Sequence, residues 1–118
     1  MKRDMDLIRE LLFAIETLET VRGEAQLPFD KYDSEQIYYH VRLLHEAGLA
    51  HAANCSTGME FCWVPTSLTW QGHEFLDAAR NDEVWNKAKS QIKSVAGSIS
   101  FDILKGLLNK LAMSLLGM

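Results

Sequence analysis

The spacing of hydrophobic positions along the chain predicts a mostly helical α+β fold with one β-hairpin. Between Ser34 and Thr69 the order is helix, glycine stop, two-stranded ribbon and new helix start. Apolar residues first recur at three- and four-residue steps, which is the period of an amphipathic helix. They then alternate with small and polar residues, as in a strand that has one covered face.

A helix is predicted to begin at Asp33 or Ser34, where Gln36 is placed to complete a capping box. Its inward positions are Ile37, Val41 and Leu44. Ala47 and Gly48 close the helix, because glycine readily takes the left-handed conformation of a helix end, and Leu49 then packs back.

Residues 49–65 are predicted to form the hairpin, with Gly58 supplying the positive φ of a short turn. Thr69 is placed to cap the next helix. Gly72 lies in the first turns of that helix and indicates a close approach between its backbone and the ribbon. The large side chains of this helix are expected to hold the ribbon down: Trp70, Phe75 and Leu76.

Two further helices are predicted on either side of this region. Asp4 can cap an N-terminal helix that ends at Gly23, with these residues on its buried face: Leu7, Leu11, Ala14, Ile15, Leu18 and Val21. Only nine residues separate Gly23 from Asp33, so no full helix fits between them. After Asn81 and Asp82 a fresh cap introduces an amphipathic continuation or a bent extension of the preceding helix. Trp85 within it is expected in the core rather than against a ligand.

The last segment is predicted to be an amphipathic helix capped by Ser98 or Ser100. One stripe of this helix consists of Phe101, Leu104, Leu108, Leu111 and Leu115. Further apolar residues widen the face: Ile103, Leu107, Met113 and Leu116. Such a face needs a second surface, and packing within the chain and a homodimer through this stripe both remain open.

Helix, ribbon and clamping helix in this order are the organisation of a winged-helix domain, in which the ribbon is the wing. The sequence therefore predicts a winged-helix-like domain in residues 1–97, followed by a C-terminal amphipathic helix in residues 98–118. In many winged-helix proteins a further helix precedes the recognition helix, and here it would be missing or reduced to a turn.

Charge argues against nucleic acid as the partner. The chain of 118 residues has 12 basic and 16 acidic groups, for a net charge of −4. Residues 1–53 hold six of the basic and ten of the acidic groups. An acidic surface repels a phosphate backbone, so any contact with DNA would have to be local.

The outward face of helix 34–46 and the ribbon tip supply the candidate contacts for a protein partner: Glu35, Tyr39, Arg42, Glu46, Thr57 and Met59. A major-groove reader usually carries several basic or amide donors, whereas here two carboxylates flank one arginine. The tip has no Lys or Arg that could hold a phosphate. The alternative interpretation is a solvated face with internal ion pairing.

The sequence predicts neither catalysis nor a bound cofactor or metal. His40, His45, His51 and His73 lack the spacing of a metal site or a catalytic pair, and no glycine-rich phosphate loop occurs. The only cysteines are Cys55 and Cys62.

A ribbon that pairs these two cysteines could form a cross-strand disulfide. However, no signal segment and no run of eighteen apolar residues occur, so a cytoplasmic protein without a membrane span is expected. In a reducing cytosol we expect two small reduced hydrophobic residues instead.

Several phrases together resemble a family of small bacterial proteins, a domain of unknown function often met in phage and prophage gene sets. They are "MKRDMDLIRELLFAIE", "YYHVRLLHEAGLA", "LTWQGHEFLDAARNDEVWNKAK" and "SFDILKGLL". The resemblance spans nearly the whole chain and implies no catalytic residues. The phrases "HEAGLA" and "LTWQGHEFL" are also similar to the recognition-helix exit and post-wing helix of winged-helix regulators.

Two hypotheses follow from these observations. The first is a non-catalytic accessory protein of a mobile element that binds another protein, for example to interfere with a host defence factor. The second is a dimeric winged-helix transcriptional regulator, with Tyr39 and Arg42 in a DNA groove and the C-terminal helix as the dimer interface.

Overall fold

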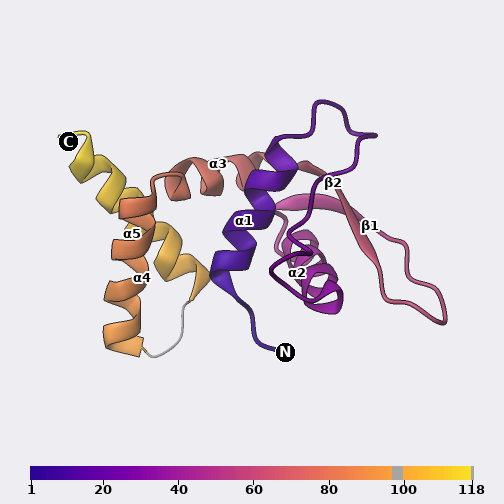
Figure 1. Cartoon of the computed structure of the whole chain (residues 1–118). Coiled ribbons are helices and arrows are strands. Elements are labelled where there is room, and N and C mark those ends of the chain that lie inside the picture. The colour runs from indigo at the N-terminus through magenta and orange to yellow at the C-terminus, as the bar shows by residue number, and fades with distance from the viewer. Residues whose placement is uncertain (97–99, 118) are drawn as a thin grey trace. The chain divides into compact units, whose positions relative to one another are not determined.

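The computed structural model describes residues 1–96 and 100–117. Within them lie five helices and one two-stranded antiparallel sheet (Figure 1). In chain order these are α1 (Met5–Glu16), α2 (Ser34–Glu46), β1 (Ala50–Asn54), β2 (Trp63–Leu68), α3 (Trp70–Ala79), α4 (Asp82–Ala96) and α5 (Phe101–Leu115). This is the mostly helical α+β class that the sequence predicts. None of the described helices is long and apolar enough to cross a membrane.

The chain forms two compact units, Met1–Glu74 and Phe75–Met118, each described by itself below. The boundary between them falls inside α3. The predicted division after residue 97 lies at residues outside the described ranges and stays a prediction. The order α2, hairpin, α3 is the predicted one, and membership of the winged-helix class also stays a prediction.

The first helix begins as predicted but ends earlier. The Asp4 carboxylate accepts hydrogen bonds from the backbone N–H groups of Asp6 and Leu7, at 3.0 and 3.2 Å. The helix stops at Glu16, not at Gly23. Threonine hydroxyls compete with the helical pattern there, because Thr17 Oγ1 donates to the Ala14 carbonyl and Thr20 Oγ1 accepts from the Arg22 N–H.

The prediction that Val21 belongs to the buried helical face is therefore wrong, since this side chain is 66% exposed. The buried face of α1 consists of Met5, Leu7, Ile8, Leu11, Leu12 and Ile15. As predicted, no helix occurs in the connector from residue 17 to residue 33.

The second helix starts at Ser34 with Asp33 as its N-cap, but the Asp33 side chain makes no capping hydrogen bond, so the predicted capping box with Gln36 is wrong. The inward stripe Ile37, Val41 and Leu44 is fully buried, as predicted. Gly48 has a φ of 74°, which confirms the left-handed helix end. The Leu49 N–H then bonds back to the Leu44 carbonyl at 2.9 Å.

His40 connects the starts of α1 and α2 within the first unit. Its side chain is fully buried, and Nδ1 lies 2.8 Å from the Gln36 carbonyl. Its Nε2 accepts the Asp4 backbone N–H at 2.8 Å. Because Nε2 is the acceptor, Nδ1 carries the proton that is donated to Gln36, and both ring nitrogens have partners.

The predicted hairpin is present, with β1 antiparallel to β2 and Ala50 opposite Leu68. A bulge between His51 and Ala52 gives β2 one extra residue, Thr66, and the Thr66 hydroxyl donates to the His51 carbonyl at 3.2 Å. Gly58 does not take the positive φ that the sequence predicted.

The turn is closed by a side chain instead. Thr57 Oγ1 accepts from the N–H groups of Met59 and Glu60, at 3.2 and 3.1 Å, and the Thr57 N–H donates to the Glu60 carbonyl at 2.8 Å. A hydroxyl that replaces a backbone acceptor in this way lets the chain reverse without a left-handed residue.

The base of the hairpin is attached to α3 at Gly72. A Cβ built on Gly72 would lie far inside contact distance of the Leu49 carbonyl oxygen, which confirms the predicted close approach. Thr69 Oγ1 accepts the Gly72 N–H at 3.0 Å, as an N-cap should, and it donates to the Gly48 carbonyl. Trp70, predicted to hold the ribbon down, is 77% exposed and does not supply that contact area.

In the second unit, α4 and α5 pack together around aromatic side chains. Asn81 caps α4 through its side-chain oxygen, which accepts the Val84 N–H at 3.0 Å. Trp85 is buried, as predicted, with the Phe75 ring 6.4 Å away in an edge-to-face arrangement. The Phe75 ring also lies 4.8 Å from the Phe101 ring. Ser100 is the N-cap residue of α5, and Ser98 lies outside the described residues.

We predict that replacing His40 with Phe, which has a similar ring but no nitrogen, destabilises the protein by about 1–3 kcal/mol, because the partly buried Asp4 N–H loses its acceptor. The measurement is chemical denaturation followed by circular dichroism. His51→Phe is the matched control, since His51 is exposed on β1 and should change stability by less than about 0.5 kcal/mol. Equal stability of the two variants would contradict the buried hydrogen bond.

Candidate functional site

Arg42 is the centre of a cluster formed by α2 and the hairpin. Its guanidinium carbon lies 5.1 Å from the Tyr39 ring centroid and 5.4 Å from that of Phe61. Arg42 Nε is also 3.6 Å from a carboxylate oxygen of Glu46, one helical turn on. Cation–π contacts of this kind are favourable, and more so when the cation is partly desolvated.

One more contact extends the cluster along α2, where the His45 and Trp63 rings lie 5.4 Å apart. The α2–hairpin cluster thus consists of Tyr39, Arg42, His45, Glu46, Phe61 and Trp63. The predicted outward face of α2 is therefore in part an internal contact with the hairpin. Glu35 lies exposed in the first turn of α2, one turn before Tyr39.

The electrostatic role of Arg42 is local. Among the described residues its buried Nε has no hydrogen-bond partner. The guanidinium lies against the two rings and near the Glu46 carboxylate, and 37% of the side chain is exposed. A groove-reading arginine extends its donors toward base edges or phosphates. Arg42 instead has its guanidinium held against two side chains of its own chain.

The hairpin tip, residues 55–62, presents the other two candidate contacts. Met59 is 97% exposed, so nearly its whole side chain faces solvent. Thr57 is also exposed, but its hydroxyl is used to close the turn. Phe61 lies two residues after Met59 and reaches the Arg42 guanidinium, so the tip and the α2–hairpin cluster are adjacent along the chain.

A disulfide joins Cys55 and Cys62, whose Cα atoms are 5.0 Å apart. The expectation of two reduced cysteines is therefore wrong. The physical reason is register, because the Cys55 N–H donates to the Cys62 carbonyl at 3.0 Å and this pairing places the two side chains opposite each other.

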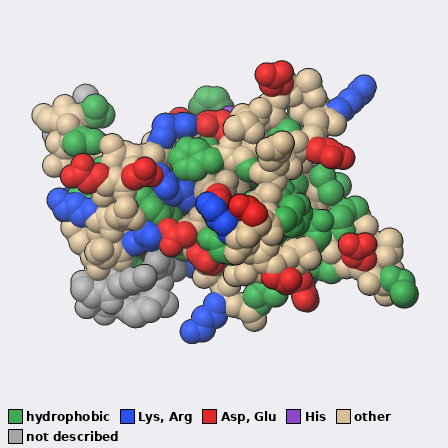
Figure 2. Space-filling view, viewed as in Figure 1, with side chains coloured by type: hydrophobic (Ala, Val, Ile, Leu, Met, Phe, Trp, Pro, Cys, Tyr) green, Lys and Arg blue, Asp and Glu red, His purple; other side chains and the backbone are tan. Residues whose placement is uncertain are grey.

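Apart from Arg42, the stretch of chain around the tip carries no basic residue. The sequence has no Lys or Arg from residue 43 to residue 79, and the first unit as a whole has 6 basic and 12 acidic residues. On the face seen in Figure 2, hydrophobic side chains gather over the part of the first unit that includes the hairpin, with Asp and Glu side chains among them.

The pKa values of two connector side chains, Tyr32 and Lys31, are raised. Burial raises the pKa of Tyr32, and the carboxylates of Asp4, Glu10 and Asp6 add to this increase. The pKa of Lys31 is raised by its hydrogen bond and charge interaction with Glu10, at 3.0 Å. The Lys31–Glu10 pair attaches the connector to α1 but is exposed, so it adds little stability.

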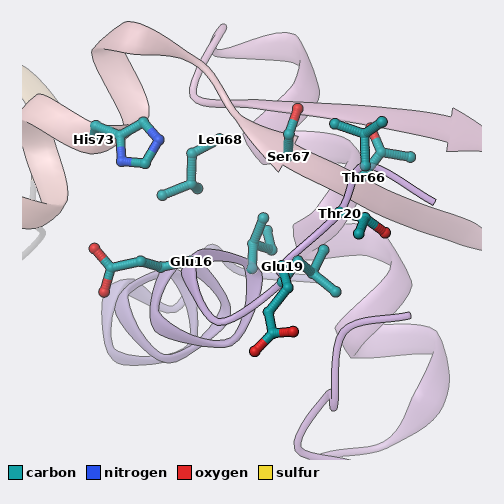
Figure 3. A pocket seen from close by; sticks show the side chains of 10 residues that line it. Glu16, Glu19, Thr20, Thr66, Ser67, Leu68 and His73 are labelled. Carbon is teal, nitrogen blue, oxygen red and sulfur yellow. The ribbon is translucent and has the colours of Figure 1, made fainter. Parts of the chain in front are cut away.

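A small open pocket lies where the end of α1 and the connector meet β2 and α3. Its volume is 140 Å³, and Figure 3 places His73 at one end and Thr20 and Thr66 at the other, with Leu68 between them. Pockets for substrates and cofactors usually have 300–1,000 Å³. This pocket is too small to support a proposal of catalysis.

Among the described residues, no group of three or more His, Cys, Asp or Glu side chains could hold a metal ion. The four histidines have different surroundings. His40 is structural, His45 stacks on Trp63, His73 lines the small pocket, and His51 is exposed.

The residues predicted for oligomerisation fall into two groups. Leu104 and Leu108 are fully buried, and Phe101 stacks on Phe75 within the same unit. Leu111 is half-buried, while Leu115 is 64% exposed. The described part of α5 and its end also expose Ile103, Met113 and Leu116.

Sequence reasoning did not include Phe61 and Trp63 among the site residues. A usable signal was present, because these residues alternate along the second arm of the hairpin and therefore share one face. That face had to be covered by something, and the hairpin is flanked in the chain by α2 and α3. What the sequence could not supply was the identity of the side chains on α2 that would meet it.

Comparison with known proteins assigns the chain to a family but not to an activity. A family model described as "Hypothetical protein (DUF2513)" matches residues 2–99. A protein of Haemophilus influenzae (strain KW20 / Rd) named "Uncharacterized protein" is 46% identical over 107 residues, which cover 89% of this chain and 90% of the relative. No solved structure matches. The chain therefore belongs to the DUF2513 family of hypothetical proteins.

Proposed function

We propose that this protein is a non-catalytic protein-binding module whose hairpin tip and α2–hairpin cluster dock on a partner protein. The observation that carries the proposal is the 97% exposure of Met59 on a tip that is closed by hydrogen bonds and a disulfide. A lone exposed apolar side chain is ordinary, but one held at the end of a projecting, ordered hairpin is available for insertion into a pocket.

Burial of the Met59 side chain and the order of the tip before binding both favour docking. Covering a methionine side chain contributes about 1.5–3 kcal/mol. A thioether side chain also adapts to irregular pockets, which suits it as an anchor. Because the tip is ordered before binding, little conformational entropy is lost in the complex.

The partner's chemistry follows from charge. Glu60 lies at the tip and Glu46 at the cluster, with no Lys or Arg between Arg42 and Arg80. We therefore expect an apolar pocket whose rim carries Lys or Arg. Complementary charge at such a rim speeds association and selects the partner more than it raises affinity.

The DNA-binding alternative receives no support from a specific contact. Arg42, the only basic residue on the outward face of α2, is stacked between Tyr39 and Phe61. The proposal of an accessory role in a mobile element, such as interference with a host defence factor, is supported by the sequence resemblance described above.

We predict that a photo-crosslinking amino acid at position 59 captures one stoichiometric protein in cells that express this chain, and that the same probe at position 21 does not. Val21 is the matched control because its side chain is also largely exposed, at 66%, but lies beside the pocket and not at the tip. Mass spectrometry identifies the captured protein.

With the captured protein purified, Met59→Asp should weaken its affinity by at least about 10-fold, since it replaces the buried anchor by an unpaired charge. Val21→Asp should change the affinity by less than about 2-fold. Equal capture at positions 59 and 21, or binding that is insensitive to Met59→Asp, would rule out the tip as the docking surface.

A second proposal concerns self-association through α5, which is supported by the exposure of Ile103, Met113, Leu115 and Leu116. If these side chains form a homodimer interface, light scattering should give twice the monomer mass for the wild type. The double variant Leu115→Lys, Leu116→Lys should be monomeric.

The control for this prediction is Asn109→Lys, which adds a positive charge at an exposed polar position of α5 and should leave the mass unchanged. A wild-type protein that is monomeric at about 100 μM would contradict the homodimer, since useful dimer affinities are tighter than this.

A further inference from the structure

We infer that the Cys55–Cys62 pair is a reversible thiol–disulfide site, that its reductant is a dithiol, and that its redox state orders or releases the hairpin tip. The cross-link closes the ring of residues 55–62, which contains Thr57 and Met59. The inference thus concerns the regulation of the surface to which the preceding section assigns partner binding.

The disulfide is open to attack in the folded protein. Cys55 is exposed and Cys62 is half-exposed, and each residue from Ala53 to Glu60 is exposed. An attacking thiolate must approach a sulfur along the S–S axis, so access decides whether exchange occurs without unfolding. A disulfide inside a core would be protected, and this one lies outside it.

The cross-link is also the strongest restraint on the tip. Phe61, at the end of the tip, contacts the Arg42 guanidinium, but the remaining contacts between Cys55 and Glu60 are exposed hydrogen bonds. Asn54 Oδ1 accepts the Ser56 N–H at 3.0 Å, and Thr57 Oγ1 accepts two further N–H groups. No side chain from Ala53 to Glu60 is buried. Regions held by exposed hydrogen bonds and few apolar contacts open easily.

The base of the hairpin does not depend on the disulfide. Leu49, Ala50 and Leu68 are buried, and the Thr69 N–H donates to the Leu49 carbonyl at 3.1 Å. Gly72 packs against that same carbonyl. Reduction should therefore loosen residues 55–60 and leave the attachment of the hairpin to α2 and α3 intact.

Reduction by the dithiol takes two exchange steps. A thiolate of the dithiol attacks Cys55 Sγ, the S–S bond breaks, and Cys62 leaves as a thiolate that takes up a proton. The second thiol of the reductant then attacks the mixed disulfide and releases the Cys55 thiol. The protein disulfide gains two electrons and two protons, and the dithiol becomes a disulfide.

The consequence for binding rests on the proposed function. In the oxidised form Met59 is presented on a closed ring, so the tip is ordered before it meets a partner. In the reduced form the tip must be ordered during binding, which weakens the complex. The redox state of this cysteine pair would then set the affinity for the partner.

The test equilibrates the folded protein with mixtures of reduced and oxidised dithiothreitol, traps free thiols with iodoacetamide and counts the adducts by mass spectrometry. We expect complete and reversible conversion between zero and two adducts, with an unchanged far-ultraviolet circular dichroism spectrum. Cysteines that react only in denaturant would overturn the inference.

Amide hydrogen exchange on the two forms gives the second measurement. Reduction should accelerate exchange of the Cys55 and Thr57 amides by at least about 10-fold and change that of Thr69 by less than about 2-fold. The double variant Cys55→Ser, Cys62→Ser should match the reduced form under both conditions. Equal exchange at the tip in both forms would overturn the inference.

A binding arm separates this inference from the proposed function. The protein captured through position 59 is titrated against the oxidised form, the reduced form and the double serine variant. Weaker binding of the last two supports redox control. Equal binding of all three forms overturns redox control but leaves the proposed docking surface intact. Absence of binding to every form refutes the proposed function, and the thiol measurements then decide the redox site.

Discussion

The contact between Gly72 and the Leu49 carbonyl is the constraint on which the first unit depends. It brings the start of α3 against the residue that joins α2 to β1, and only a residue without a Cβ fits there. Gly48, whose positive φ ends α2, and Thr69, whose hydroxyl bonds to both Gly48 and Gly72, lie at the same corner. The end of α2, the start of β1 and the start of α3 are therefore fixed at one point, and the direction in which the hairpin leaves α2 follows from it.

A hairpin attached at its base can support an ordered but exposed far end. Arg42, which also contacts Tyr39, holds Phe61 at the end of the tip against α2, and the rest of the tip is held by the disulfide and by exposed hydrogen bonds. The hairpin is therefore held firmly at its base and less firmly at its exposed tip, and the proposed function depends on this difference. The same arrangement makes Met59 available to a partner and makes the tip sensitive to the state of its two cysteines.

The sequence predicted the elements whose signals are local. Asp4, Gly48, Thr69 and Gly72 each have a role that a short window of residues reveals, and all four perform it. Errors arose where hydroxyls competed with a regular pattern. Thr17 and Thr20 end α1 early, and Thr57 closes the hairpin turn so that Gly58 needs no special φ.

The candidate site was predictable only in part, because its contacts are between distant segments. Arg42 was predicted on the outward face of α2, but its contact with Phe61 depends on where the hairpin folds back. The disulfide depends on register in the same way. His40 had no sequence signal at all, since its partner is a backbone N–H 36 residues away.

The most direct test of the central contact is the stability of Gly72→Ala measured by chemical denaturation, with Gly106→Ala as the control. Both glycines lie within helices, but a Cβ on Gly106 would meet no atom within 4 Å. Helix propensity alone favours alanine over glycine by about 1 kcal/mol at either position. We predict that Gly106→Ala follows this propensity, whereas Gly72→Ala destabilises the protein by more than about 1 kcal/mol because backbone must move. Stabilisation by both substitutions would contradict the contact between α3 and the hairpin base.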